Sequence, residues 1–233
     1  MKINLIPSVE YINEKEIEGK IAVVIDVLRA TSVITTALYN GASEVVTTVE
    51  IEEALNYRDK NSILGGERKA LKIDGFDLSN SPCEYRKEIV AGKRVILTTT
   101  NGTRTINKSI KAESILIGCM LNGKAIAKKI VECNRDTCIV CAGTKGRFSL
   151  DDFICAGKIL NDIVECINVE LDDFATAAFL AYKDNRKDVL SYIKNASHYR
   201  YLVSIGLEDD IKYCFKEDVF DIVPEYKDGS IRI

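Results

Sequence analysis

The chain has 233 residues, enough for one large domain or two small ones, and 46% of them are apolar, as in an ordinary globular protein. Its formal net charge of −3 and its scattered basic residues argue against a nucleic-acid-binding surface. No apolar run approaches the roughly 18 residues that a membrane span requires, and the N-terminal segment lacks the pattern of a signal peptide. We therefore expect a cytoplasmic protein with no membrane or nucleic-acid partner.

Short apolar runs alternate with segments of helical periodicity along most of the chain. The predicted strands are residues 3–6, 21–25, 44–48, 62–64, 94–98, 114–117, 137–141, 211–215 and 220–223. The predicted helices are residues 31–39, 52–59, 82–90, 102–108, 121–132, 149–164, 172–183, 186–194 and 197–204. This alternation predicts an α/β fold with a mainly parallel or mixed sheet and flanking helices. If the chain forms two α/β subdomains, we expect their boundary near residues 118–124.

The stretch 21–32 is the most informative part of the sequence. Its five apolar residues predict a strand buried on both faces, and a helix is predicted to follow directly. Asp26 and Arg29 then lie at the carboxyl edge of the sheet, where α/β proteins bind ligands, and Thr31 and Ser32 lie at the helix start. Asp26 could hold a cation or attack an electrophile, and Arg29 suits an anion. The alternative is a local ion pair between Asp26 and Arg29.

Three further polar loops follow predicted strands. They contain Glu67 and Arg68; the run Thr99, Thr100, Asn101, Gly102 and Thr103; and Gly143, Thr144 and Asp152. Small and hydroxyl residues at helix starts let several N–H groups converge on a phosphate. Each loop alone could be a tight turn with a helix cap, but the agreement of four loops favours a shared site for an anion. None of them matches the P-loop or the dinucleotide-binding motif.

Other candidate features are less specific. Residues 74–82 are polar and rich in turn formers, which suits a surface loop or a flap over the site. His198 is the only histidine, and it could carry a proton or be purely structural. Cys138 and Cys141 have zinc-ligand spacing without a second pair, so we expect free thiols.

Three mechanisms could serve phosphate chemistry at these loops. Asp26 could be a carboxylate nucleophile, although Leu28 stands where haloacid-dehalogenase phosphatases have a second aspartate. Cys141 and Arg147 have the Cys-x5-Arg spacing of tyrosine phosphatases. In the third mechanism, Mg²⁺ bound by carboxylates such as Asp26, Glu67 and Asp152 neutralises the phosphoryl group and activates a water.

Seven motifs together resemble the 2-phosphosulfolactate phosphatase family over nearly the whole chain. They are Asp-Val-Leu-Arg-Ala-Thr-Ser (26–32), Gly-Gly-Glu-Arg (65–68), Gly-Phe-Asp-x-Ser-Asn-Ser-Pro (75–82), Thr-Thr-Asn-Gly-Thr (99–103), Cys-Ala-Gly-Thr (141–144), Phe-Ser-Leu-x-Asp (148–152) and Ser-His-Tyr (197–199). Asp151 stands where the family pattern has Glu, and Ser79 where it has Gly. The resemblance implies that residues 1–233 form one catalytic unit, a Mg²⁺-dependent phosphatase that cleaves 2-phosphosulfolactate to sulfolactate and phosphate. In methanogens this step belongs to coenzyme M biosynthesis.

Residues and resemblance together lead to one set of expectations. We expect Mg²⁺ at Asp26, Glu67 and Asp152, with Asp26 and His198 as catalytic residues. The expected substrate-binding residues are Arg29, Thr31, Ser32, Arg68, Thr99, Thr100, Asn101, Gly102, Thr103, Gly143 and Thr144. The partner is a small anionic phosphate ester, and a homo-oligomer is left open. Two alternatives remain: a metal-independent cysteine phosphatase that uses Cys141, and a non-catalytic protein that binds a small organic anion.

Overall fold

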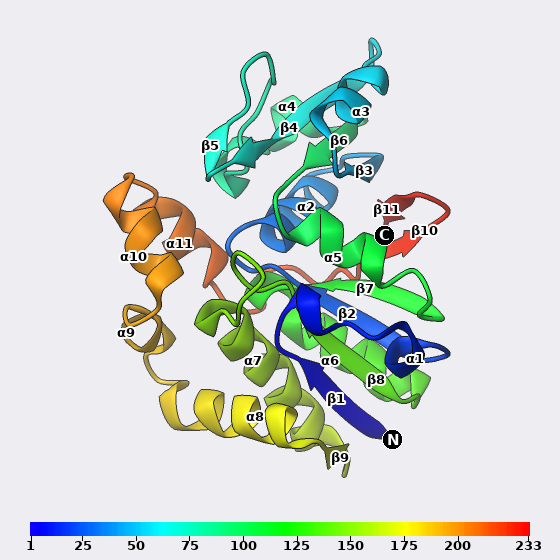
Figure 1. Ribbon diagram of the computed structural model, residues 1–233, viewed down its shortest axis with the longest axis vertical. Coiled ribbons are helices and arrows are strands. Elements are labelled where there is room, and N and C mark those ends of the chain that lie inside the picture. Colours follow the sequence, from blue (N-terminus) through cyan, green and yellow to red (C-terminus); the bar gives the residue numbers. More distant parts are fainter.

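The computed structural model describes residues 1–233, and all its strands belong to one mixed sheet (Figure 1). The strands are β1 (Lys2–Ile6), β2 (Ile21–Ile25), β3 (Glu44–Thr48), β4 (Ser62–Arg68), β5 (Leu71–Lys72), β6 (Arg94–Thr98), β7 (Ser114–Gly118), β8 (Thr137–Cys141), β9 (Glu170–Leu171), β10 (Glu225–Lys227) and β11 (Ser230–Arg232). Their order across the sheet is β5-β4-β6-β3-β11-β10-β7-β2-β8-β1-β9. The predicted α/β fold is thus confirmed, with a mixed sheet.

The sheet contains two parallel groups of strands. One group is β7, β2, β8, β1 and β9, and the other is β4, β6 and β3. The hairpin of β10 and β11 joins them through three successive antiparallel pairings, β3 with β11, β11 with β10, and β10 with β7. Because three reversals lie between β3 and β7, the two groups run in opposite directions. In Figure 1 the group with β4 and β6 occupies the top, and the group with β1 and β8 the bottom.

Helices cover both faces of this sheet. They are α1 (Glu14–Ile17), α2 (Ala30–Tyr39), α3 (Ile51–Asn56), α4 (Lys87–Val90), α5 (Gly102–Lys108), α6 (Gly123–Cys133), α7 (Leu150–Cys166), α8 (Asp173–Asn185), α9 (Val189–Ile193), α10 (Ser197–Ser204) and α11 (Glu208–Cys214). Three short 3₁₀ helices are η1 (Val9–Tyr11), η2 (Pro82–Glu84) and η3 (Met120–Asn122). None of the helices is both long and apolar enough to cross a membrane.

Strand β2 lies at the centre of the core, and all five of its residues are buried, as a strand covered on both faces requires. Val23 and Ile25 pack in a cluster with residues of α6 and α7. Ala22 and Val24 pack in a second cluster that contains residues of α2 and also residues of β3 and β6. Helix α2 therefore packs against both parallel groups, and the loop that precedes it, with Asp26 and Arg29, lies where the groups meet.

The end of the chain differs from the prediction. Residues 211–214 belong to helix α11, Phe215 is its C-cap, and residues 220–223 form no strand, so both predicted strands are wrong there. Three acidic residues, 208–210, occupy the first turn of α11, where negative charge interacts favourably with the helix dipole. This helix start outweighs the strand propensity of the residues that follow. The actual final strands are joined at Asp228-Gly229, both with positive φ (51° and 86°), as tight hairpins require.

Two other expectations have a clear outcome. The helix predicted over residues 82–90 is divided into η2 and α4, because Arg86 adopts an extended conformation between them. Cys138 and Cys141 are free thiols that belong to different core clusters, on opposite faces of β8. They therefore do not share a metal ion. One sheet runs through both sides of residues 118–124, where a subdomain boundary stays a prediction.

Candidate active site

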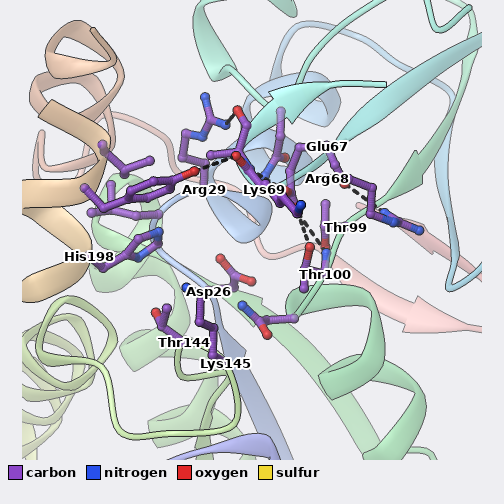
Figure 2. Close-up of a pocket in the computed structure, with 16 residues that line it drawn as sticks. Asp26, Arg29, Glu67, Arg68, Lys69, Thr99, Thr100, Thr144, Lys145 and His198 are labelled. Atoms are coloured by element: carbon purple, nitrogen blue, oxygen red, sulfur yellow. Dashed lines mark hydrogen bonds between the residues drawn. The ribbon is translucent and has the colours of Figure 1, made fainter. Parts of the chain in front are cut away.

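A pocket of about 290 Å³ lies where the loops after β2, β4, β6 and β8 meet helix α10 (Figure 2). Its lining residues are Asp26, Leu28, Arg29, Glu67, Arg68, Lys69, Ala70, Asn80, Thr99, Thr100, Asn101, Thr144, Lys145, His198, Tyr201 and Leu202. Nine of the residues singled out in the sequence are among them. The two opposed parallel groups thus bring their carboxyl ends to one place, as the four polar loops suggested.

Asp26 is the most central carboxylate in Figure 2, and it is only 8% exposed. Its Oδ1 accepts a hydrogen bond from the Ala30 amide at 3.2 Å, while Oδ2 makes no hydrogen bond within the chain. A Cβ at Gly102 would come within 2.9 Å of this Oδ2, so only glycine lets helix α5 approach so closely. Burial raises the pKa of Asp26 to about 6, and the negative charges of Glu67 and Asp151 add to the rise. A bound cation would relieve this cost.

Glu67 is a second buried carboxylate of the pocket, at the end of β4. Its Oε1 accepts hydrogen bonds from the Thr100 amide (2.9 Å) and hydroxyl (2.8 Å), and its Oε2 accepts one from the Ala70 amide (2.7 Å). Glu67 therefore fixes two lining loops in addition to supplying charge. The neighbouring Arg68 donates to the Val49 carbonyl at 2.7 Å, and in Figure 2 its guanidinium points away from Asp26.

His198 faces Asp26 from helix α10 and pairs with a buried carboxylate. Its Nδ1 lies 3.1 Å from Oδ2 of Asp151, and the Ser149 hydroxyl donates to the other oxygen of Asp151. Burial lowers the pKa of His198, but the hydrogen bond and charge of Asp151, together with the charge of Asp26, outweigh burial and raise it. The pair thus favours a protonated imidazole whose Nε2 is left for a ligand.

Asp152 lies outside the pocket lining, beneath the loops. Its two oxygens accept hydrogen bonds from the amides of Val27 and Gly143, each at 2.9 Å. Burial and the charges of Asp151 and Asp26 raise the pKa of Asp152 well above its ordinary value. Asp152 therefore clamps the loop after β2 to the loop after β8.

Other predicted substrate-binding residues also stabilise these loops, through hydrogen bonds to their backbone. The Thr31 hydroxyl accepts from the Asp26 amide, and the Ser32 hydroxyl donates to the Val27 carbonyl. Thr103 donates its hydroxyl to the Thr99 carbonyl. These residues, with Gly102 and Gly143, are absent from the lining, whereas Thr99, Thr100, Asn101 and Thr144 belong to it.

The cations of the pocket differ in how much charge they offer. Arg29 is 2% exposed and donates to Asp210 at 2.5 Å and to the Ala70 carbonyl at 2.8 Å. Much of its charge is thus neutralised inside the chain. Lys69 and Lys145 form no ion pair, and both line the pocket from exposed loop positions with positive φ (55° and 53°).

Cys141 is not part of the pocket. It is 1% exposed and packs in the core cluster of α6 and α7. Burial raises the pKa of its thiol well above the usual value, and the charges of Asp152 and Asp151 act in the same direction. A thiolate nucleophile needs the opposite environment.

The donor set fits Mg²⁺ only in part. Mg²⁺ commonly binds one or two carboxylates and keeps several waters and substrate oxygens. Asp26 suits this role because its side chain is buried in the pocket wall while its Oδ2 makes no hydrogen bond within the chain, and Glu67 adds negative charge at the same pocket. Asp152 does not offer a free oxygen. No three such side chains form a ready-made metal cluster.

Several lining residues carry little signal in the sequence. Lys69 and Ala70 form the turn between β4 and β5 with positive φ, yet neither residue is a usual turn former. Asn80 lies in the segment 74–82, which could be noted only as a loop or flap. Tyr201 and Leu202 sit three and four residues after His198 on α10, so the helical period was the one signal available for them.

Comparisons with known proteins agree with the motifs. Residues 6–229 match the family model described as 2-phosphosulpholactate phosphatase. A protein of Clostridium beijerinckii named "Probable 2-phosphosulfolactate phosphatase" is 55% identical over 99% of both chains. Proteins with the same name from Clostridium acetobutylicum and Clostridium tetani are 53% and 51% identical, over 99–100% of each chain. The chain belongs to the 2-phosphosulfolactate phosphatase family.

Proposed function

We propose that this protein is a Mg²⁺-dependent phosphatase that hydrolyses 2-phosphosulfolactate to sulfolactate and inorganic phosphate. The observation that supports this most directly is the pocket in which the buried carboxylate of Asp26 faces the His198–Asp151 pair. The names of the full-length relatives supply the substrate. An acidic centre surrounded by hydroxyl, amide and lysine donors suits a small, highly charged phosphate ester.

Each group of the pocket then has a chemical task. Asp26 would hold Mg²⁺, with Glu67 adding charge beside it, and the bound ion would neutralise the phosphoryl group and activate a water. Thr99, Asn101 and Thr144 line the pocket as donors for phosphoryl oxygens. His198, protonated with the help of Asp151, would give its Nε2 proton to the ester oxygen as the P–O bond breaks, so that sulfolactate leaves as an alcohol.

The cysteine mechanism gains no support from the structure. Cys141 is buried outside the pocket, and burial raises the pKa of its thiol. Arg147 lies on the exposed outer part of its loop, where its carbonyl accepts from the Thr144 amide. A non-catalytic anion-binding protein would use the same pocket, so turnover has to separate that alternative from a phosphatase.

The decisive experiment is phosphate release from synthetic 2-phosphosulfolactate with and without Mg²⁺. We expect EDTA to abolish release and added Mg²⁺ to restore it, with phosphoglycolate and phospholactate as poorer substrates. D26N should bind the substrate without turning it over. Activity that survives EDTA would refute the metal requirement. Equal rates on all three esters would refute the substrate. Binding of sulfolactate with no turnover of any ester would favour the binding protein.

A further inference from the structure

One wall of the pocket carries two polar side chains that the chain leaves without partners. Asn80 is 4% exposed and lines the pocket, yet its carboxamide makes no hydrogen bond within the chain and its Oδ1 is buried. Lys69 forms no ion pair, and the hydroxyl of Tyr201 donates to its backbone carbonyl at 2.8 Å. The backbone of Lys69 is thus held in place while its ammonium group remains available.

A buried ion pair fixes both residues in this wall. Arg29 donates to the carbonyl of Ala70, the residue after Lys69, at 2.8 Å. It also donates to Asp210 at 2.5 Å, and Asp210 accepts from the hydroxyl of Ser81, the residue after Asn80. The turn of β4 and β5 and the segment 74–82 are therefore both anchored to the same arginine–aspartate pair.

The distribution of charge singles out Lys69 on this wall. Arg29 is occupied by Asp210, Arg68 donates to Val49 and Thr98, and His198 is paired with Asp151. Lys145, the other lysine of the lining without an ion pair, comes from the loop of Thr144. In Figure 2 Lys145 lies below Asp26, whereas Lys69 lies above Asp26, beside Arg29. A ligand with negative groups on the Arg29 side would therefore pair with Lys69.

The Oδ1 of Asn80 is sealed, so the Nδ2 of this pocket residue, which also makes no hydrogen bond within the chain, is the polar atom left for a ligand or a bound water. We propose, on the basis of the proposed function, that Lys69 and Asn80 bind the acid groups that the substrate carries besides its phosphoryl group. Lys69 supplies the charge for a carboxylate or sulfonate, and the Asn80 amide donates a hydrogen bond to it. The two residues would thereby set the preference for an ester with an acidic tail over a plain alkyl phosphate.

Matched substrates and variants test this assignment. Isopropyl phosphate keeps the secondary phosphate ester of 2-phosphosulfolactate but lacks both acid groups. K69M and N80A should each lower kcat/KM for 2-phosphosulfolactate by about tenfold or more, the effect of one lost bond to a charged group, and change that for isopropyl phosphate by less than about twofold. K72M removes an exposed lysine of β5 outside the lining and serves as the control.

Sulfolactate binding, measured by calorimetry, gives a second readout that does not depend on turnover, and it decides the case if isopropyl phosphate reacts too slowly. We expect K69M and N80A to bind sulfolactate more weakly than the wild-type protein, and K72M to bind it with unchanged affinity. The melting temperature of N80A should not fall, because its amide makes no bond within the chain. Equal losses on both substrates, or unchanged sulfolactate binding, would overturn the inference. Failure of the wild-type protein to hydrolyse 2-phosphosulfolactate would instead overturn the proposed function.

Discussion

Replacing Asp151 with asparagine tests whether this carboxylate keeps the His198 ring protonated. The side chains of His198 and Asp151 are 17% and 1% exposed, so water screens their interaction little. Burial lowers the pKa of His198, and the hydrogen bond and charge of Asp151 raise it above the ordinary value. A hydrogen bond to a charged group contributes about 1.5–3 kcal/mol, so D151N should reduce the ratio of protonated to neutral imidazole at a fixed pH about ten- to a hundredfold.

NMR gives a direct assay, because His198 is the only histidine and its ring signals need no assignment. The pKa of His198 should fall in D151N and stay constant in D209N, which changes an exposed aspartate paired with Lys212. Since the folded pKa is raised, the pair stabilises the wild-type fold fully below the unfolded pKa of about 6.5 and loses this contribution as the pH rises through the folded value. An unchanged titration in D151N would refute this account.

Three more substitutions have defined outcomes. D26N should raise the free energy of unfolding near pH 7.5 by about 3 kcal/mol, because the fold favours the protonated form of Asp26. This magnitude follows from the rise of the Asp26 pKa from 3.8 to about 6, at 1.36 kcal/mol for each pKa unit. The gain should be absent below pH ~4, and thermal melts at both pH values check it. D152A leaves two buried amides without acceptors and should lower the free energy of unfolding by about 2 kcal/mol or more in urea titrations below pH ~4, where no buried charge of Asp152 offsets this loss, and a loss below about 1 kcal/mol would contradict the clamp. C141A should keep its phosphate release and its response to EDTA; loss of activity in a folded variant would revive the cysteine mechanism.

The central elements of the fold could be predicted from local sequence patterns. The bounds of β2, β3, β6, β8, α5 and α10 agree with the predictions, because apolar runs flanked by turn formers and caps defined them. Residues 211–223 could not be predicted in this way. Residues 211–215 are rich in strand formers, yet the acidic turn before them and the burial of Ile211 and Cys214 against the core make residues 211–214 helical. The Asp228-Gly229 hairpin did have a recognisable local signal.

The candidate site was predictable in its location but less so in the tasks of single residues. Strand ends indicated where Asp26, Glu67 and Thr99 would meet. Whether a side chain faces the pocket or the backbone depends on tertiary packing, as Asp152 and Arg68 show, since both satisfy buried backbone groups. Asn80 could not be singled out, because a free carboxamide becomes apparent only when its surroundings are known.

The C-terminal hairpin has a consequence for the synthesis of this protein. Ile231 is fully buried and pairs with Val45, and Tyr226 pairs with Ile115, so residues 225–232 supply the only strands between β3 and β7. While a nascent chain still holds these residues in the ribosome, the two strand groups remain unjoined and their edges unpaired. Since the pocket draws residues from both groups, we expect a chain that stops before Glu225 to be inactive and prone to edge-to-edge aggregation.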